Sequence, residues 1–259
     1  MEIRVAKSAG FCFGVNRAIQ HAYDNIGRGS IYSYGPIIHN KEVTADLESK
    51  GVKIIDSFEG IEEGTVIIRS HGVGKQVYDE LERRGLSILD GTCPFVKKIH
   101  NIVKDAHNDG RGIIIIGDPD HPEVMGINGW CDRSAFIIDG EYKGGLKKDV
   151  PYTVVVQTTY RKEKFEAVLK ELEEDGIKAD INNTICSATS ERQAEAEKIA
   201  KEATKMLVVG DKSSSNTQKL YEICKKNCNN TFYIETIKDL VLNIFNRNVR
   251  IGITAGAST

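Results

Sequence analysis

Hydrophobic residues are distributed along this 259-residue chain in two alternating patterns. Short runs rich in valine and isoleucine, bounded by glycine, aspartate or asparagine, are typical of buried strands. Between most of these runs, apolar residues recur every three or four positions, which predicts amphipathic helices. This alternation predicts an α/β fold with mostly parallel sheets and right-handed crossovers. The expected strands are residues 1–6, 31–34, 52–55, 65–69, 87–90, 112–116, 135–138, 152–157, 177–181, 205–210, 231–234 and 249–254.

The expected helices follow the same pattern, each with one apolar face. Pro94 suits the first turn of a helix that begins after Cys93. Ser190 and Gln193 fit a capping box, which would open a helix after Cys186. Near the end of the chain, Ile237, Leu240, Val241 and Ile244 share one face of a last expected helix.

The twelve expected strands divide into three sets of four. Residues 31–90 hold one set and 112–181 hold another, but 205–254 supply only three strands, so we assign strand 1–6 to the third sheet. The pattern is threefold without a close sequence repeat. We therefore expect three α/β units with small, mostly parallel four-stranded sheets, spanning 13–92, 93–183, and 184–259 completed by 1–12.

Three of the six cysteines share one local pattern. Cys12, Cys93 and Cys186 each follow the end of an apolar run and precede a helical pattern, about a third of the chain apart. Ligands of open parallel sheets bind beyond the carboxyl ends of the strands, where these loops lie. We therefore expect three similar units to deliver three thiolates to one centre.

Three thiolates are one short of a closed structural zinc site. A 4Fe–4S cube held by three cysteines leaves one iron free to bind a substrate oxygen as a Lewis acid, while the cluster passes electrons. A helix N-terminus behind each thiolate would help to stabilise such an anionic cluster. By contrast, Cys131, Cys224 and Cys228 are expected to be small buried apolar residues.

Polar residues gather in the remaining strand-end loops. Three histidines could bind a metal, but an anion fits better beside neighbouring hydroxyl and amide groups at a predicted helix start. Glu123, in the sequence DHPE, is the candidate acid, because a carboxylate near an anion should have a raised pKa. The expected anion-binding residues are His39, His71, His121, Thr158, Ser214, Ser215, Asn216 and Ser258, with Thr158 also placed to relay a proton.

Composition narrows the functional classes further. The 35 basic and 37 acidic residues give a net charge of −2, which argues against a nucleic-acid binder. The longest aliphatic run is Ile113 to Ile116, far short of a membrane span, and the N-terminus lacks a secretory signal. We expect a cytoplasmic protein with reduced thiols, rather than one with three disulfides. No Walker-type motif predicts nucleoside triphosphate binding.

Taken together, the motifs AGFCFGVNRA, IHN, RSHGV, GTCP, GDPDHPEV, QTT, TICSAT, SSSN and TAGAS, from residue 10 to 258, resemble the LytB-type 4-hydroxy-3-methylbut-2-enyl diphosphate reductases. The resemblance implies a trefoil of three α/β units around a central iron–sulfur cluster. It implies two-electron reductive dehydroxylation of an allylic diphosphate to isopentenyl and dimethylallyl diphosphates. Ferredoxin or flavodoxin is the implied electron donor, with no nucleic acid or membrane partner.

The resemblance also assigns roles to individual residues. Cluster ligation aligns with Cys12, Cys93 and Cys186, and proton donation with Glu123. The cofactor implied is a 4Fe–4S cluster, for which a 3Fe–4S cube is a damage product. Diphosphate binding aligns with the eight residues given above, and Gln157, Thr159 and Thr189 are implied to support the site.

One feature departs from the family pattern. The chain stops at Thr259, directly after TAGAS, whereas relatives usually continue, which would affect how Ser258 is held. Two other functions are compatible with the pattern of cysteines. One is a hydro-lyase with an open-iron 4Fe–4S cluster and no net redox change. The other is a zinc-stabilised module whose loops bind a phosphorylated partner.

Overall fold

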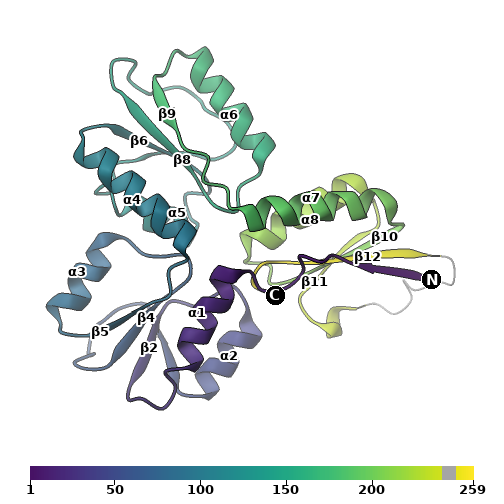
Figure 1. Cartoon of the computed structure of the whole chain (residues 1–259), viewed down its shortest axis with the longest axis horizontal. Helices are drawn as coiled ribbons and strands as arrows, with labels where there is room; N and C mark the ends of the chain where they lie inside the picture. Colours follow the sequence, from purple (N-terminus) through teal and green to yellow (C-terminus); the bar gives the residue numbers. More distant parts are fainter. Residues whose placement is uncertain (241–248) are drawn as a thin grey trace. The chain divides into compact units, whose positions relative to one another are not determined.

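The structure is a computed structural model that describes residues 1–240 and 249–259. The described strands form three separate sheets of four, and every pairing between them is parallel. The predicted fold class of three α/β units with small parallel four-stranded sheets is therefore confirmed. Figure 1 shows each sheet beside its helices.

The first sheet has the order β3-β2-β4-β5. Its strands are β2 (Ile31–Tyr34), β3 (Val52–Ile55), β4 (Thr65–Ile68) and β5 (Ser87–Asp90). Helices α1 (Phe13–Tyr23), α2 (Lys41–Ser49) and α3 (Lys75–Arg83) precede or connect these strands. All four strands coincide with predicted strands to within one residue.

The second sheet has the order β7-β6-β8-β9. Its strands are β6 (Gly112–Ile116), β7 (Phe136–Ile138), β8 (Tyr152–Val156) and β9 (Ala179–Ile181). Its helices are α4 (Pro94–Asn108), α5 (Pro122–Asn128) and α6 (Lys162–Glu174). As predicted, Pro94 is the first residue of α4.

The third sheet joins the two ends of the chain. Its order is β1-β12-β10-β11, and β1 pairs with β12 in the register Glu2↔Arg250, so the N-terminal strand completes this sheet as predicted. The strands are β1 (Glu2–Val5), β10 (Lys205–Val209), β11 (Thr231–Ile234) and β12 (Arg250–Ala255). The described helices are α7 (Ser187–Glu202), α8 (Ser215–Asn227) and the 3₁₀ turn η1 (Ile237–Asp239).

The second sheet shows why its strands are continuous apolar runs. Successive side chains of a strand point to opposite faces, and a parallel sheet with helices on both faces buries both. Ile114 and Ile116 pack in a cluster that includes Phe165 of α6. Ile113 and Ile115 pack in a second cluster, which includes Ile99 of α4. Both faces of β6 are therefore core, which leaves the strand-end loops to carry the polar chemistry.

Two predicted helix features do not match described elements of the structure. The helix after Cys186 begins at Ser187 with Cys186 as its N-cap, so the predicted capping box at Ser190 and Gln193 is wrong. The cysteine sulfur accepts the backbone hydrogen bond of Thr189 and thereby takes the capping role. The predicted apolar face from Ile237 to Ile244 extends into residues 241–248, outside the described part of the chain.

By backbone contacts the chain divides into two compact units. We call Met1–Asn16, His39–Val43 and Cys186–Thr259 unit 1, and Arg17–Ile38 with Thr44–Ile185 unit 2. Unit 1 contains the third sheet, and unit 2 contains the other two. The domain boundaries at 13–92, 93–183 and 184–259 with 1–12 stay a prediction. Within residues 1–240 and 249–259, no helix combines the length and apolar character needed to cross a membrane.

Candidate functional site

Cys12, Cys93 and Cys186 occupy equivalent positions at the start of helices. Cys93 and Cys186 are the N-cap residues of α4 and α7, and Cys12 directly precedes α1. The carbonyl oxygen of each accepts a hydrogen bond from the amide four residues later, at 2.9, 2.9 and 3.1 Å for Cys12, Cys93 and Cys186. Each sulfur therefore belongs to a residue at the positive end of a helix dipole, as the sequence predicted.

The six cysteines fall into two classes of environment. All six are free, and Cys12, Cys93 and Cys186 are partly exposed. The other three, Cys131, Cys224 and Cys228, are buried in hydrophobic clusters, as expected from the sequence. Burial raises the pKa of Cys224 to about 12, so it stays a thiol at neutral pH. Among the six cysteines, the three at helix starts are therefore the accessible ones.

The helix-start cysteines fit an iron–sulfur cluster by their donor chemistry. Thiolates are the usual ligands of such clusters, and hydrogen bonds to sulfur adjust their properties. The backbone amide of Thr189 donates to Cys186 Sγ at 3.3 Å, and the Thr189 hydroxyl lies 3.0 Å from the same sulfur. Thr189 thus holds Cys186 Sγ through two contacts, and its supporting role at the site stays a prediction.

In unit 2, the loop of Cys93 is tied to the loop of His71. The Cys93 amide donates to the carbonyl of Ser70 at 3.0 Å, one residue before His71. On the other side of Cys93, Arg17 Nη1 donates to the carbonyl of Thr92 at 3.0 Å. A predicted cluster ligand and a predicted substrate ligand therefore share one backbone scaffold.

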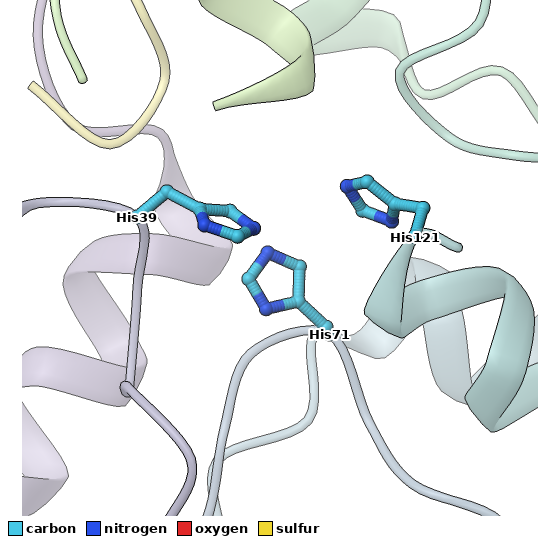
Figure 2. A group of neighbouring side chains, drawn as sticks. All are labelled: His39, His71 and His121. Carbon is cyan, nitrogen blue, oxygen red and sulfur yellow. The ribbon is translucent and has the colours of Figure 1, made fainter. Parts of the chain in front are cut away.

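His71 and His121 lie together within unit 2. Their rings meet edge to face, with centroids 5.5 Å apart and planes at 82°. Figure 2 shows His71 on the loop that follows β4 and His121 at the start of α5. His121 is the N-cap of α5, and its Nδ1 accepts a hydrogen bond from the Glu123 amide at 3.1 Å. This contact fixes the His121 ring and requires an unprotonated Nδ1.

The carboxyl group of Glu123 is buried, and both of its oxygens accept hydrogen bonds from one residue. Glu123 is only 2% exposed. The amide of Thr158 donates to Glu123 Oε1 and the Thr158 hydroxyl donates to Oε2, each at 2.6 Å. Burial raises the pKa of Glu123 to about 7, although both hydrogen bonds from Thr158 act to lower it. Such a carboxyl can hold and give up a proton at neutral pH.

Gln157, next to Thr158, holds the surrounding loops. Its Oε1 accepts a hydrogen bond from the Asp118 amide at 3.0 Å, and its Nε2 donates to Thr159 Oγ1 at 2.9 Å. The loop after β6 is thereby joined to the loop after β8. Gln157 and Thr159 thus connect these two loops, and their supporting role at the site stays a prediction.

In unit 1, the start of α8 lies beside the segment that carries His39. His39 Nδ1 is 3.2 Å from Ser213 Oγ, and Ser258 Oγ donates to the His39 carbonyl at 3.0 Å. Ser258 Oγ also lies 3.4 Å from the Oγ of Ser214, the N-cap residue of α8. His39 is the third histidine labelled in Figure 2. Four polar residues from three chain segments thus form one group within this unit.

Asn216 is a buried polar residue at the start of α8 in unit 1. It is 4% exposed, and within the described residues neither its Oδ1 nor its Nδ2 has a hydrogen-bond partner. Buried polar atoms are nearly always paired, so an unpaired amide indicates a missing partner. Asn216 lies in the first turn of α8, where backbone N–H groups favour an anion. A phosphate group would satisfy both requirements.

Sequence reasoning missed three residues in or beside this group, namely Ser213, Asp211 and Asn40. Ser213 contacts His39, and Asp211 orients it by accepting bonds from the Ser213 amide at 2.8 Å and hydroxyl at 2.7 Å. Asn40 Nδ2 donates to the Ser258 carbonyl at 2.8 Å. The runs SSSN and IHN were visible signals for Ser213 and Asn40. Asp211 carried no such signal.

The predicted site residues fall into two sets. Unit 1 contains Cys12, His39, Cys186, Ser214, Ser215, Asn216 and Ser258. Unit 2 contains His71, Cys93, His121, Glu123 and Thr158. Each set combines cysteine thiols at helix starts with groups that can bind an anion, and unit 2 adds the acid Glu123.

Comparison with known proteins yields one consistent group. The profile of the LytB protein family matches residues 3–259. A 4-hydroxy-3-methylbut-2-enyl diphosphate reductase from Thermoanaerobacter sp. (strain X514) is 46% identical, over 100% of this chain and 92% of that protein. A protein of the same name from Clostridioides difficile (strain 630) is also 46% identical, over 100% of this chain and 95% of the relative.

Two solved structures are similar to this chain. One is described as (E)-4-hydroxy-3-methyl-but-2-enyl diphosphate reductase, the terminal enzyme of the non-mevalonate pathway. It has a TM-score of 0.72 and 38% identity, with coverage of 100% of this chain and 95% of that one. The other is the E-1-hydroxy-2-methyl-but-2-enyl-4-diphosphate reductase from Plasmodium falciparum. It has a TM-score of 0.92 and 28% identity, with coverage of 100% and 84%.

Proposed function

The chain belongs to the LytB protein family, whose profile spans residues 3–259, and we propose from this premise that it reduces (E)-4-hydroxy-3-methylbut-2-enyl diphosphate. The products are isopentenyl diphosphate and dimethylallyl diphosphate. The observation that carries the chemistry is the buried Glu123 carboxyl, whose pKa is about 7 and whose oxygens both accept hydrogen bonds from Thr158. The proposal makes the protein an oxidoreductase of isoprenoid biosynthesis.

The conversion must balance electrons and protons. It takes up two electrons and two protons for each substrate molecule. The allylic C–O bond breaks, and the hydroxyl group leaves as water with one proton. The second proton forms a new C–H bond at one of two carbons, which yields the two products. The protein must therefore deliver electrons, supply protons and hold a diphosphate in place.

Cys12, Cys93 and Cys186 would hold a 4Fe–4S cluster, which can be recovered as a 3Fe–4S cube after damage. When bound, this group supplies the electrons and an iron without a protein ligand. The support is the shared helix-start position of the three partly exposed cysteines. We assign ferredoxin or flavodoxin as the electron donor. The reduced thiols that this role needs persist in the cytoplasm, where we place the protein.

Glu123 and Thr158 move the proton. With a pKa of about 7, Glu123 is protonated in a large fraction of molecules at neutral pH. When Oε2 carries this proton it donates to Thr158 Oγ1, across the contact that the two atoms already make, and Thr158 turns its own hydroxyl proton toward the substrate hydroxyl. The short contact keeps donor and relay aligned, so little reorganisation is needed when the substrate arrives.

The remaining polar residues bind the diphosphate. Asn216 gains a partner for its buried amide, and the start of α8 supplies backbone N–H groups. The assigned ligands are His39, His71, His121, Thr158, Ser214, Ser215, Asn216 and Ser258.

Anaerobic incubation with the synthetic diphosphate tests the proposal. Reduced protein should form isopentenyl and dimethylallyl diphosphates, detected by mass spectrometry. Without reductant, product should be absent. A hydro-lyase with the same kind of cluster would turn over without reductant, and that result would replace the proposed function. A zinc-stabilised module would be colourless and inactive under both conditions.

A further inference from the structure

The loop that carries Cys12 is fastened to the helix that begins at Cys186. Glu195 of α7 accepts hydrogen bonds from the amides of Lys7 and Ser8, each at 2.9 Å, and from the Ser8 hydroxyl at 2.6 Å. Arg192, one turn earlier on α7, donates from Nη2 to the Gly10 carbonyl at 2.7 Å. All of these residues lie in unit 1. The loop is thus held at two points, ahead of Cys12.

Helical periodicity places both fastening residues on one face of α7. Positions three and four apart lie on the same side of a helix, as Ala188, Arg192 and Glu195 do. Arg192 Nη1 donates to the Ala188 carbonyl at 3.1 Å, which directs the guanidinium across this face. Since Cys186 is the N-cap of α7, one helix carries one predicted cluster ligand and holds the loop of another.

The hydrogen bond from Arg192 to the loop involves a residue with an uncommon backbone conformation. Gly10 has φ of +105°, a value that residues with a Cβ rarely adopt. Its carbonyl is the group that Arg192 contacts, two residues before Cys12. At the cysteine itself, the Cys12 amide donates to the Ala257 carbonyl at 3.0 Å, and the Cys12 carbonyl accepts from the Asn16 amide at 2.9 Å. The chain around Cys12 is therefore fixed on both sides before any ligand is added.

The positive charge of Arg192 lies in an unusual, buried position. Arg192 is 5% exposed, and its Nη1 and Nη2 donate to backbone carbonyls, those of Ala188 and Gly10, rather than to a carboxylate. Its Nε is buried without a hydrogen-bond partner within residues 1–240 and 249–259. A buried guanidinium without an anion is unfavourable, because transfer of an ion from water is costly. The nearest acid along the helix face, Glu195, is engaged by Lys7 and Ser8. Arg192 thus lacks a counter-charge that an anionic group could provide.

We propose that Arg192 and Glu195 are positioning residues that present Cys12 and Cys186 together on one scaffold, and that Arg192 balances the negative charge of the thiolate-bound cluster. The inference rests on the proposed function, because it assumes that both cysteines ligate the cluster. Its two parts make different predictions. Loss of the hydrogen bonds to the loop should increase the mobility of the chain around Cys12. Removal of the buried positive charge should change the midpoint potential of the cluster.

The first experiment needs no cluster. Hydrogen exchange of residues 6–12 should be at least about tenfold faster in metal-free Arg192→Gln and Glu195→Gln than in the metal-free parent. Lys201→Gln, an exposed change on the same helix, is the matched control and should exchange like the parent. Circular dichroism of each protein confirms that it is folded. Unchanged exchange in folded Arg192→Gln and Glu195→Gln would overturn the positioning role.

The second experiment uses anaerobically loaded protein. Arg192→Gln should lose iron to a chelator roughly tenfold faster than the parent, and its cluster should have a lower midpoint potential, because a nearby positive charge favours the more negative reduced form. Arg192→Lys should restore the potential, since it keeps the charge. Equal potentials in Arg192→Gln, Arg192→Lys and the parent would overturn the charge role. If the parent itself binds no iron, the proposed function and the charge role both fail, and the exchange data still decide on positioning.

Discussion

Thr158 holds both oxygens of the buried Glu123 carboxyl, with its amide on Oε1 and its hydroxyl on Oε2, each at 2.6 Å. The two bonds stabilise the carboxylate, whereas burial stabilises the neutral acid, and the result is a pKa of about 7. A carboxyl group balanced in this way can store a proton and release it at the pH of the cell.

Replacement of Glu123 by glutamine should remove the proton donor and keep the shape of the site. We expect kcat to fall by roughly 10²-fold or more, the scale of lost general acid catalysis. The cluster absorbance and the affinity for the diphosphate should stay within about twofold of the parent. Steady-state kinetics under anaerobic conditions measure kcat. Absorption spectroscopy measures the cluster absorbance, and calorimetry measures the affinity for the diphosphate. Near-normal turnover would remove Glu123 from the mechanism.

The pH profile of turnover gives an independent check on Glu123. Because the acid must be protonated to act, kcat should be highest below pH 7 and decline as the pH rises through the Glu123 pKa of about 7. Thr158→Val removes the hydroxyl that bonds Oε2 and helps to lower this pKa, so any remaining activity should decline at higher pH. A flat profile in the parent between pH 6 and 8 would contradict the assignment.

Glu123 should also make the stability of the metal-free protein depend on pH. Its pKa in the folded state, about 7, is above the ordinary value of 4.5, so above pH 4.5 the unfolded chain releases this proton first. Its contribution to the free energy of unfolding is therefore full below pH 4.5 and is lost as the pH rises through about 7. The predicted loss is about 3 kcal/mol. The free energy of unfolding, measured with urea at a series of pH values, should fall with rising pH by this additional amount in the parent relative to Glu123→Gln. Parallel pH dependences in the two proteins would argue against the prediction.

The cysteine assignments can be tested with a matched pair of variants. Cys93→Ser should abolish the broad absorbance near ~400 nm of anaerobically purified protein, as expected when a cluster ligand is lost. Cys131→Ser replaces a buried core cysteine whose Sγ donates to the Asn128 carbonyl at 3.4 Å, and it should keep the absorbance. If both variants keep the absorbance, Cys93 is not a ligand.

Asn216 should contribute to substrate binding at the expense of stability. Asn216→Ala should weaken diphosphate binding by about tenfold or more, because hydrogen bonds to charged groups contribute about 1.5–3 kcal/mol. In the substrate-free protein the same change removes a buried unpaired amide, so the free energy of unfolding should be unchanged or higher.

Lys226→Ala, an exposed change in the last turn of α8, is the control for Asn216 and should leave both affinity and stability unchanged. Calorimetric titration and thermal unfolding provide the two measurements. Lower stability with unaltered affinity in Asn216→Ala would mean that Asn216 is a packing residue.

Features that depend on local pattern could be predicted from the sequence. The run Ile113 to Ile116 indicated a strand, which is β6, and the residues before Cys93 and Cys186 indicated strand-end loops that lead into helices. Contacts between distant segments carry no such signal. The bonds from Ser258 to His39 and from Arg192 to Gly10 join residues 219 and 182 positions apart. Only the folded chain reveals them.

One misassigned cap illustrates the same limit. Ser190 and Gln193 have the composition of a capping box, yet α7 begins earlier, because Cys186 Sγ accepts the Thr189 amide. Cysteine is not among the usual N-cap residues, so propensity favoured the serine. The Cys186 sulfur takes the place of the ordinary cap, and the local rule therefore failed at a residue that we propose as a cluster ligand.

The number of electrons consumed for each product molecule tests the central claim most directly. Anaerobic titration of the protein and the allylic diphosphate with a reduced one-electron donor should show two electrons taken up for each isopentenyl or dimethylallyl diphosphate formed. Product formed without consumption of the donor would contradict a reductive dehydroxylation and indicate a non-redox elimination.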